Sequence, residues 1–514
     1  MKGGIVTGPR VLFATPEVAG FAKTGGLADV SASLPRALAQ LGVTVAVVMP
    51  YYNAVRRSGQ PIERTSFVLP VPLGDRVLAC RVYRSVLPCS SVPIYFIEHS
   101  PFFERDDPRL GRSLYQQVML GGYRADYPDN AERFIFFSRA VLELVPHLEF
   151  RPDVLHLNDW QTALVPLFLV ESYHSRPGYT HLCTLLTIHN LAYQGIFGRD
   201  VLPLTGLPGW LFNPAQLEYH GFFNFLKAGI VYADAVNTVS PTYAREIQTP
   251  EYGYGLEGLL ASVRYKLTGI VNGCDYEQWD PARDPHIAAP YTPDTVVERK
   301  SLCKADLQRR FDLPVMADAP VLGMIARLVH QKGIDLVLGA APGFLDLGCQ
   351  IVFLGEGDRE YHDQLQAFRA RHPNRVGLYL GFHEGLAHVI EAGADLFLMP
   401  SRYEPCGLNQ LYSLKYGTPP VVRITGGLAD TVVNATEENI AAGTATGFAF
   451  QDYTASALYE TVRWALTLYH QRPHHFRQIM QTAMRQDWSW NRSAREYAVL
   501  YERLCSTASR SQRA

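Results

Sequence analysis

The sequence lacks the segments that hold a protein in a bilayer or cross-link it through disulfides. No apolar run approaches the ~18 residues that a membrane-spanning helix requires, and the run at residues 163–170 is interrupted by Pro166. The eight cysteines are scattered and form no C-x-x-C pair, which is typical of reduced intracellular thiols. The amino-terminal residues show no secretory apolar core, so we expect a cytoplasmic protein.

Charge of either sign is not in excess. There are 47 Lys and Arg residues against 49 Asp and Glu, giving a net charge of −2, so we expect neither nucleic acid nor a membrane as a partner. With 514 residues, 47% of them hydrophobic, the chain is long and apolar enough for two to four folded domains. This composition excludes a disordered chain.

Several motifs of cofactor and metal chemistry are also missing. There is no GKS or GKT, so no P-loop is predicted, and GEGDRE at residues 355–360 lacks the third glycine of a dinucleotide fingerprint. HEGLAH at residues 383–388 has the wrong spacing for a zinc helix. No two aspartates stand two residues apart, so a D-x-D metal clamp is missing. We therefore expect no metal and no cofactor, and a bound diphosphate would be neutralised by Lys and Arg.

Short apolar runs alternate with longer helix-like stretches along the whole chain, which is typical of parallel sheets covered on both faces. The runs fall into two sets, which predicts an α/β protein of two doubly wound domains, with the boundary in the Gly- and Tyr-rich stretch 249–258. The predicted strands are 11–15, 43–49, 94–98, 154–157, 183–188 and 235–239 in the first set, and 269–271, 321–326, 350–354, 376–380, 395–399 and 420–423 in the second.

The hexapeptide TGGLAD occurs twice, at residues 24–29 and 425–430. Each copy follows a predicted strand and precedes a helical stretch. Glycines let a backbone turn tightly, and the amino end of a helix favours an anion. Each half of the chain therefore offers a turn suited to phosphate, although an ordinary Gly-rich turn is the alternative for either copy.

Three cations accompany these turns. Lys23 directly precedes the first copy, and Arg327 and Lys332 follow the predicted strand 321–326. Each alone could be a solvated surface charge. Because ligands of open α/β sheets bind beyond the carboxyl ends of the strands, the three together favour a phosphate site.

Polar side chains end three other predicted strands. Glu404 follows strand 395–399, and Pro405 favours an extended backbone there. Asp159 and His189 end neighbouring strands, so they point into one crevice. Carboxylate and imidazole groups suit sugar hydroxyls or a developing positive charge. A helix-capping carboxylate and a core histidine are the alternatives.

Seven ordered motifs over nearly the full length resemble bacterial glycogen synthases and plant starch synthases that use ADP-glucose. They are TPEVAGFAKTGGLADV, HLNDW, TIHNLAYQG, NGCDYEQWDP, ARLVHQKGIDL, PSRYEPCGLNQLYSLKYGTPPVVRITGGLADTV and QDWSWNRSAREYAVLYERL. The resemblance implies a glycosyltransferase-B fold with a cleft between two Rossmann-like domains. The expected parts are an acceptor domain (1–255), a donor domain (256–488) and a last helix (489–514) that returns to the first domain.

The resemblance also implies roles for individual residues. Expected as catalytic are Glu404, Arg327, Lys332, His189 and Asp159. Expected to bind ADP-glucose are Lys23, Gly25, Gly26, Lys304, Phe382, Asn409, Thr425, Gly426 and Gly427. Phe382 falls where relatives place an aromatic residue against adenine. Asn409 replaces a common Thr, and Asn158 a common His.

The implied activity is transfer of glucose from ADP-glucose to the non-reducing end of an α-1,4-glucan, with retention of configuration. The expected partners are ADP-glucose and a glycogen or α-1,4-glucan primer. Two alternatives stay open: a retaining glycosyltransferase that uses UDP-glucose or a small acceptor, and a non-catalytic glucan-binding protein.

Overall fold

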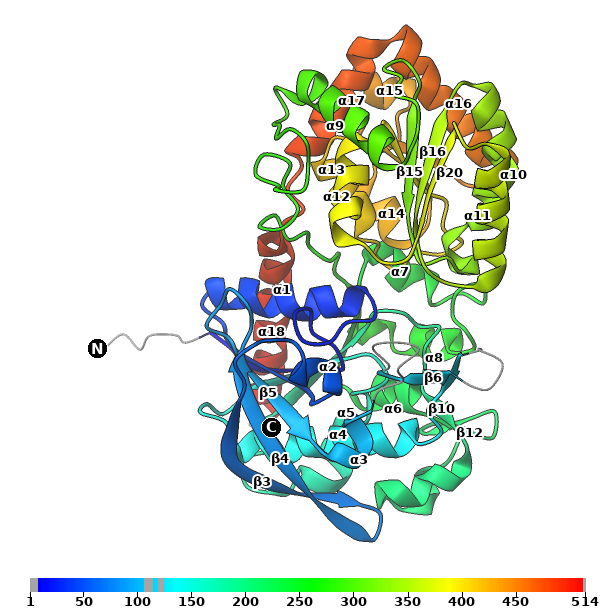
Figure 1. Cartoon of the computed structure of the whole chain (residues 1–514). Helices are drawn as coiled ribbons and strands as arrows, with labels where there is room; N and C mark the ends of the chain where they lie inside the picture. Colours follow the sequence, from blue (N-terminus) through cyan, green and yellow to red (C-terminus); the bar gives the residue numbers. More distant parts are fainter. Residues whose placement is uncertain (1–7, 106–113, 119–123, 512–514) are drawn as a thin grey trace, which may run out of the picture. The chain divides into compact units, whose positions relative to one another are not determined.

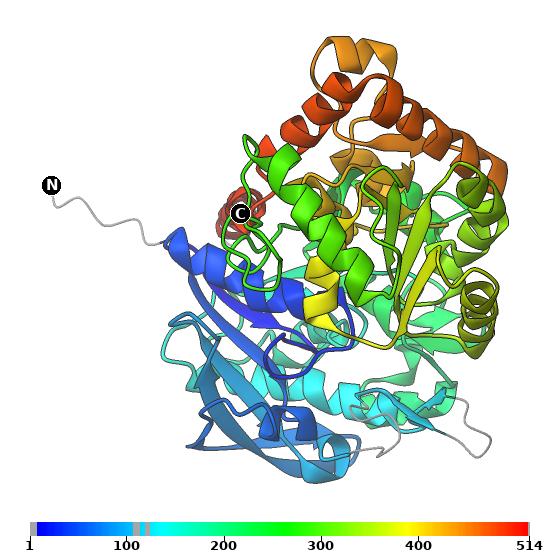
Figure 2. The same cartoon turned by 45° about the horizontal axis from the view of Figure 1, so that its top comes forward.

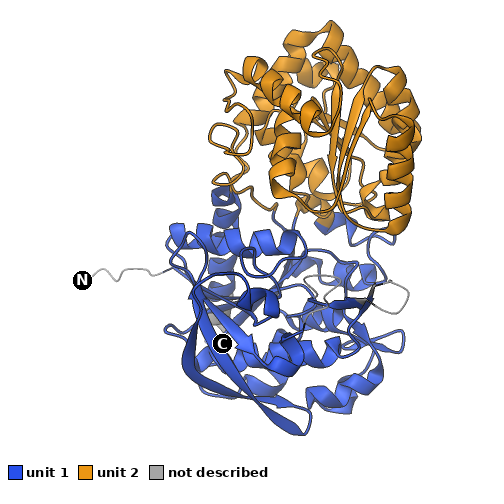
Figure 3. Ribbon diagram, viewed as in Figure 1, with its two compact units in different colours: residues 1–239, 244–270, 490–514 blue, residues 240–243, 271–489 orange. Residues whose placement is uncertain are grey.

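The computed structural model describes residues 8–105, 114–118 and 124–511. The chain forms two compact units (Figure 3). Unit 1 comprises residues 1–239, 244–270 and 490–514, and unit 2 comprises residues 240–243 and 271–489. The division therefore lies after Ile270, not after residue 255 as expected. The reason is that residues 256–270 include strand β14 (Leu267–Gly269), which pairs in parallel with β13 (Ala235–Thr238) of unit 1.

Unit 1 is built on a nine-stranded sheet of order β14-β13-β9-β8-β1-β2-β5-β4-β3. Strands β5, β4 and β3 of this sheet are labelled in Figure 1. The strands from β14 to β5 pair in parallel. Their central members are almost wholly buried because helices cover both faces. Besides β13 and β14, they are β1 (Arg10–Ala14), β2 (Thr44–Pro50), β5 (Pro93–Glu98), β8 (Val154–Asn158) and β9 (Cys183–Ile188).

The sequence reasoning missed the antiparallel edge of this sheet. Strands β3 (Glu63–Leu73) and β4 (Arg76–Val86) form a long hairpin against β5. Many of their side chains are exposed, so they do not read as continuous apolar runs. Pro70 and Pro72 lie on β3, the edge strand, where a missing amide proton costs least.

Helices α1 (Gly26–Gln40) and α18 (Trp490–Ser511) pack against each other in unit 1, and α18 also contacts β8 and β9. The predicted last helix is thus present and extends to Ser511. Its buried face carries Tyr497 and Tyr501, both fully buried, whereas Leu500 is only partly buried. Helix α4 (Asn130–Leu144) is buried along most of its length beneath the hairpin.

Unit 2 contains a six-stranded sheet of order β17-β16-β15-β18-β19-β20, and every pairing is parallel. Helices α9 (Val296–Arg310) and α12 (Glu384–Gly393) cover one face, and α10 (Ile334–Asp346) and α11 (Arg359–Arg371) cover the other; Figure 2 shows the same arrangement from a second direction. The strands are β15 (Val321–Ile325), β16 (Gln350–Gly355), β17 (Val376–Leu380), β18 (Leu396–Met399), β19 (Pro420–Arg423) and β20 (Phe448–Phe450).

Alternate residues along each strand enter different cores, as a sheet covered on both faces requires. On β16, Ile351 and Phe353 join the larger apolar cluster, whereas Val352 and Leu354 join the smaller. Every predicted strand overlaps an observed one, and the expected pair of doubly wound α/β sheets is confirmed. Among the described residues, no helix is both long and apolar enough to cross a membrane.

One carboxyl group is buried in unit 2 at an energetic cost. Glu391 on α12 is fully buried, and within the described part of the chain neither of its side-chain oxygens accepts a hydrogen bond. The neighbouring Lys300 ammonium donates instead to the backbone oxygen of Ala392 and to Thr418 Oγ1. Burial therefore raises the pKa of Glu391 well above its ordinary value, with Lys300 opposing the shift.

We expect Glu391→Gln to stabilise the protein above about pH 5. A carboxyl with a raised pKa in the folded state takes up a proton on folding, so its cost is absent below the unfolded pKa and grows as the pH rises. The difference in unfolding free energy between variant and wild type should grow by up to about 1.4 kcal/mol per pH unit. Urea unfolding from pH 4 to pH 8 measures it, and a difference independent of pH would contradict the assignment.

Candidate active site

The polar residues expected to act in unit 1 lie at the carboxyl ends of three adjacent strands. Strand β8 pairs with β1 on one side and with β9 on the other. The segments that follow these strands are residues 15–29, 158–160 and 189–190, which we call the unit 1 site. Parallel pairing is what brings them to one edge of the sheet.

The first Gly-rich turn is held from within by a residue that the sequence reasoning missed. Glu17 is buried, and its Oε2 accepts from the Thr24 amide at 2.5 Å and the Gly25 amide at 3.4 Å. Its Oε1 accepts from Thr24 Oγ1 at 2.5 Å. Lys23 Nζ, in turn, lies 2.6 Å from Asp29 Oδ1. Lys23 and the Gly25 amide, two of the expected anion-binding groups, are thus already paired inside unit 1. Gly26 opens helix α1.

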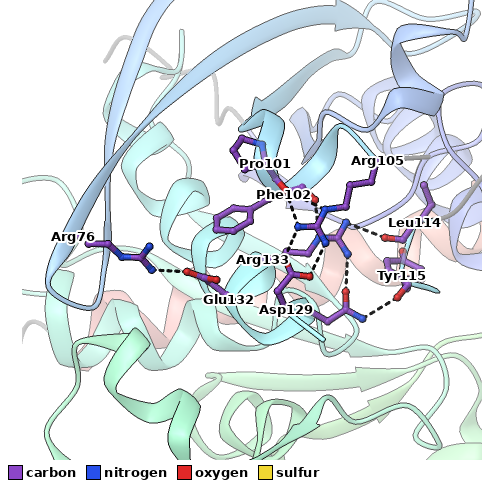
Figure 4. A network of polar contacts seen from close by, with 10 residues as sticks. Arg76, Pro101, Phe102, Arg105, Leu114, Tyr115, Asp129, Glu132 and Arg133 are labelled. Atoms are coloured by element: carbon purple, nitrogen blue, oxygen red, sulfur yellow. Dashed lines mark hydrogen bonds and ion pairs between the residues drawn. The ribbon is translucent and has the colours of Figure 1, made fainter. Parts of the chain in front are cut away.

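Helix α4 fixes the segment that reaches Glu17. Tyr115 Oη donates to Glu17 Oε1 at 2.8 Å, and Asn130 Nδ2 donates to the Tyr115 backbone oxygen at 3.0 Å. The buried Arg133 donates to Asn130 Oδ1 and to the Leu114 backbone oxygen (Figure 4). Each of the three guanidinium nitrogens of Arg133 donates a hydrogen bond. The buried group is therefore held in place, and Tyr115 is held toward the turn.

Asp159 and His189 are joined directly. Asp159 has a left-handed backbone with φ of 56°, uncommon for a residue with a side chain, and its Oδ1 accepts from the His189 amide at 2.7 Å. Burial raises the pKa of Asp159 to about 7, against the lowering effect of the His189 and Asn190 amides. This carboxyl can therefore exist in either protonation state near neutral pH.

The protonation of His189 follows from its neighbour. Asn158 Nδ2 donates to the Ala14 backbone oxygen, so Asn158 Oδ1 faces His189 Nε2 at 2.9 Å. Because that oxygen can only accept, His189 carries its proton on Nε2 and keeps a lone pair on Nδ1. Burial lowers the pKa of His189 to about 3, so its imidazole is neutral at pH 7 and serves as a hydrogen-bond acceptor.

In unit 2, the corresponding residues follow the adjacent strands β15, β18 and β19, and we call residues 327–332, 401–409 and 423–427 the unit 2 site. Glu404 is buried, and both of its oxygens accept from Lys332 Nζ, at 2.9 and 2.6 Å. Ser401 Oγ donates to Glu404 Oε2 at 2.9 Å. The sequence-predicted Lys332 and Glu404 are thus brought together.

The second Gly-rich turn packs on the Glu404 segment so closely that it tolerates no side chain. A Cβ on Gly426, whose φ is 45°, would lie 2.0 Å from the Glu404 backbone oxygen, and one on Gly427 would lie 2.1 Å from that of Cys406. The Gly427 amide donates to the Glu404 oxygen at 3.1 Å. Thr425 is buried ahead of the short helix α14 (Gly426–Thr431). The turn therefore fixes the backbone that carries Glu404.

The remaining expected residues of unit 2 lie at the same edge of the sheet. Arg327 follows β15 and is exposed. Asn409 opens helix α13 (Asn409–Lys415) and donates to the Ile325 backbone oxygen at the end of β15. Phe382 follows β17 with its side chain 75% exposed, so the ring is open to a ligand.

Known proteins match the chain over nearly its full length. A family model described as the starch synthase catalytic domain matches residues 10–262, and one described as glycosyl transferases group 1 matches residues 307–482. Glycogen synthases from Rhodopirellula baltica and Anaeromyxobacter dehalogenans are 45% and 47% identical, over 97% and 96% of this chain and 98% and 99% of those proteins. The chain belongs to the glycogen synthase family.

Solved structures agree with this assignment. The catalytic domain of starch synthase IV from Arabidopsis thaliana, bound to ADP and acarbose, matches with a TM-score of 0.87 at 31% identity, over 97% of this chain and 99% of that chain. Sucrose-phosphate synthase from Thermosynechococcus elongatus, at 17% identity and a TM-score of 0.58, shares the fold. The resemblance drawn from the motifs and the glycosyltransferase-B fold are thereby confirmed.

The structure corrects one expected site residue of this glycogen synthase family member. Lys304 Nζ pairs with Asp395 Oδ2 at 2.7 Å and donates to the Ala317 backbone oxygen at 2.9 Å. The same Asp395 carboxylate accepts from the amide of Val321, the first residue of β15. Lys304 therefore lies at the amino ends of β15 and β18, opposite the edge that carries Lys332 and Glu404, and does not join the unit 2 site.

We expect Lys304→Met to lower the free energy of unfolding by about 3–5 kcal/mol, because it leaves the Asp395 carboxylate, which is only 13% exposed, without its cation. The Kd for ADP, the nucleotide expected from the sequence, should not change. Urea unfolding and calorimetric titration measure the two effects, and the double variant Lys304→Met/Asp395→Asn should recover part of the lost stability. A weaker Kd for ADP at unchanged stability would return Lys304 to the site.

Proposed function

We propose that the protein transfers glucose from ADP-glucose to the 4-hydroxyl at the non-reducing end of an α-1,4-glucan, with retention of configuration. The observation that carries the proposal is the buried Glu404 carboxylate, bound by Lys332 beside a Gly-rich turn, in a chain of the glycogen synthase family. A pure glucan-binding protein would not need this arrangement of charges.

In the proposed reaction, the bond between C1 of the donor glucose and the diphosphate oxygen breaks, and negative charge builds on the departing ADP. The acceptor O4 bonds to C1 on the same face, and the O4 proton passes to the departing ADP. Arg327 and Lys332 stabilise that charge. An ammonium has three protons, and Glu404 accepts two donated bonds from Lys332, so one proton can still be donated to a phosphate oxygen. Removing one preorganised contact of this kind costs about 3–4 kcal/mol, or 10²–10³ in rate.

Positive charge also develops on the glucose ring during the reaction, and the site has to stabilise it. Glu404 is negatively charged and fixed by Lys332 and Ser401, so we propose that it stabilises the sugar. We assign His189 and Asp159 to the sugar hydroxyls, since neutral His189 offers the Nδ1 lone pair and Asp159 can accept or donate. No covalent glycosyl-enzyme is proposed.

The remaining assignments concern the nucleotide. Lys23 and the turn at Gly25–Gly26 are proposed to contact the diphosphate, where a phosphate must replace the Glu17 and Asp29 contacts. Thr425, Gly426 and Gly427 are proposed to contact the donor from unit 2. Phe382 is proposed to stack on adenine and Asn409 to contact the donor. ADP in the Arabidopsis starch synthase structure supports adenine as the base.

The donor and acceptor are tested together by incorporation of labelled glucose. ADP-glucose and UDP-glucose are each supplied with glycogen and with free glucose, and product is measured after precipitation of the glucan. We expect incorporation from ADP-glucose into glycogen. Faster transfer from UDP-glucose, or to the free sugar, would favour the alternative glycosyltransferase, and glycogen binding without incorporation would favour a binding protein.

We expect Glu404→Gln to lower kcat by roughly 10²–10³ while the protein stays folded, because the amide keeps the size of the side chain and removes its charge. Glu391→Gln is the matched control, since it makes the same change at a buried carboxyl of unit 2 outside the site. Steady-state kinetics and thermal unfolding compare the two. Near-wild-type turnover of Glu404→Gln would remove Glu404 from the chemistry.

A further inference from the structure

A chain of buried polar side chains joins the last helix to the strands that carry the unit 1 site. From α18, Tyr501 Oη lies 2.7 Å from His156 Nδ1, and Tyr497 Oη lies 2.9 Å from Asn237 Oδ1. Between them, His156 Nε2 lies 2.7 Å from Thr187 Oγ1, which lies 3.1 Å from Asn237 Oδ1. All five side chains are essentially fully buried.

The direction of every proton in this chain can be derived. Asn237 Nδ2 donates to the Thr238 backbone oxygen at 3.0 Å, so Asn237 Oδ1 faces the hydroxyls and can only accept. Thr187 therefore donates to Asn237, and its oxygen must accept from His156 Nε2. A neutral His156 then has no proton on Nδ1, so Tyr501 donates to it.

When His156 is neutral, a single arrangement of protons satisfies the network. Burial lowers the pKa of His156 well below its ordinary value, in agreement with this arrangement. Without the hydroxyl of Tyr501, His156 Nδ1 would be a buried acceptor with its donor removed, which a folded protein avoids. The ring would then gain by turning toward another donor, which would weaken its hydrogen bond to Thr187.

The network ends two residues short of the unit 1 site. His156 and Asn158 share one face of β8, and Thr187 on β9 lies two residues before His189. Thr187 and Asn158 are paired in the register of β8 and β9. Asn158 Oδ1, in turn, accepts from His189 Nε2. Two adjacent strands, β8 and β9, therefore connect the His156 ring to His189. We expect a displacement of the ring to shift the ends of both strands.

We infer that Tyr501 of α18 is a positioning residue for His189: by donating to Nδ1, its hydroxyl holds the His156 ring in place beside Thr187 and thereby holds the ends of β8 and β9. It touches neither substrate nor the reacting atoms. The kinetic part of this inference rests on the proposed function, because it assigns His189 to the transferred sugar. The structural part depends only on the hydrogen bonds within unit 1.

The variant Tyr501→Phe removes the hydroxyl and keeps the ring. Tyr173→Phe is the matched control, since Tyr173 is a fully buried tyrosine of unit 1 whose hydroxyl donates to Glu143 at 2.6 Å outside this network. We expect Tyr501→Phe to lower kcat for glucose transfer about three- to tenfold relative to Tyr173→Phe, and to change the Kd for ADP less than about twofold.

The second readout is nitrogen NMR of histidine-labelled protein without substrate. In the wild type, His156 and His189 should both carry the proton on Nε2. In Tyr501→Phe, the His156 signals should change and those of His189 should shift, while Tyr173→Phe leaves both unchanged. The signals of each histidine are assigned by their absence from the spectra of His156→Gln and His189→Gln.

The inference is overturned if kcat of Tyr501→Phe equals that of Tyr173→Phe, or if the His189 signals are the same in Tyr501→Phe and wild type. If the wild type transfers no glucose from ADP-glucose, the proposed function fails and the NMR result alone decides the inference. A shift of His189 in Tyr501→Phe then supports it, and an unchanged His189 overturns it.

Discussion

Parallel strand pairing is the constraint on which both sites depend. When β8 lies between β1 and β9, the segments after these strands leave the same edge of the sheet, and Glu17, Asp159 and His189 come close without a loop having to span the unit. The pairing of β15, β18 and β19 does the same for Lys332, Glu404 and the second Gly-rich turn. Because these strands are buried on both faces of the sheet and closely packed, they hold the residues at this edge in place.

Several of the charges at these edges are paired within their own unit. Glu404 lies against Lys332, Lys23 against Asp29, and Glu17 against the amides of its turn. Pairing offsets the desolvation cost of burying each charge. It also means that an anionic ligand gains only the difference between its own contacts and those it replaces. Replacing these internal contacts therefore favours a ligand whose charged groups are placed to make equivalent contacts.

The two copies of TGGLAD show how one sequence serves two structural purposes. The first opens α1 and is held by the Glu17 side chain. The second opens the short helix α14 and packs its glycines onto the backbone of residues 404–406. The glycines of the second copy leave no room for a side chain, whereas a Cβ on Gly25 in the first copy would meet nothing within 4 Å. The identical letters therefore predict a turn, and the partner of that turn depends on what lies across from it.

How much the sequence determined by itself is clear from these examples. Continuous apolar runs identified the parallel strands, and motifs placed Lys332, Glu404, Asp159 and His189 at strand ends, because both signals are local in the chain. The antiparallel β3–β4 hairpin was missed because many of its side chains are exposed. Only the tertiary structure decided that Lys304 lies at the opposite edge beside Asp395. It alone brought Tyr115 to Glu17 and Tyr501 to His156, pairs 98 and 345 residues apart. A hydrogen bond depends on distance in space, and no spacing along the chain records contacts of that separation.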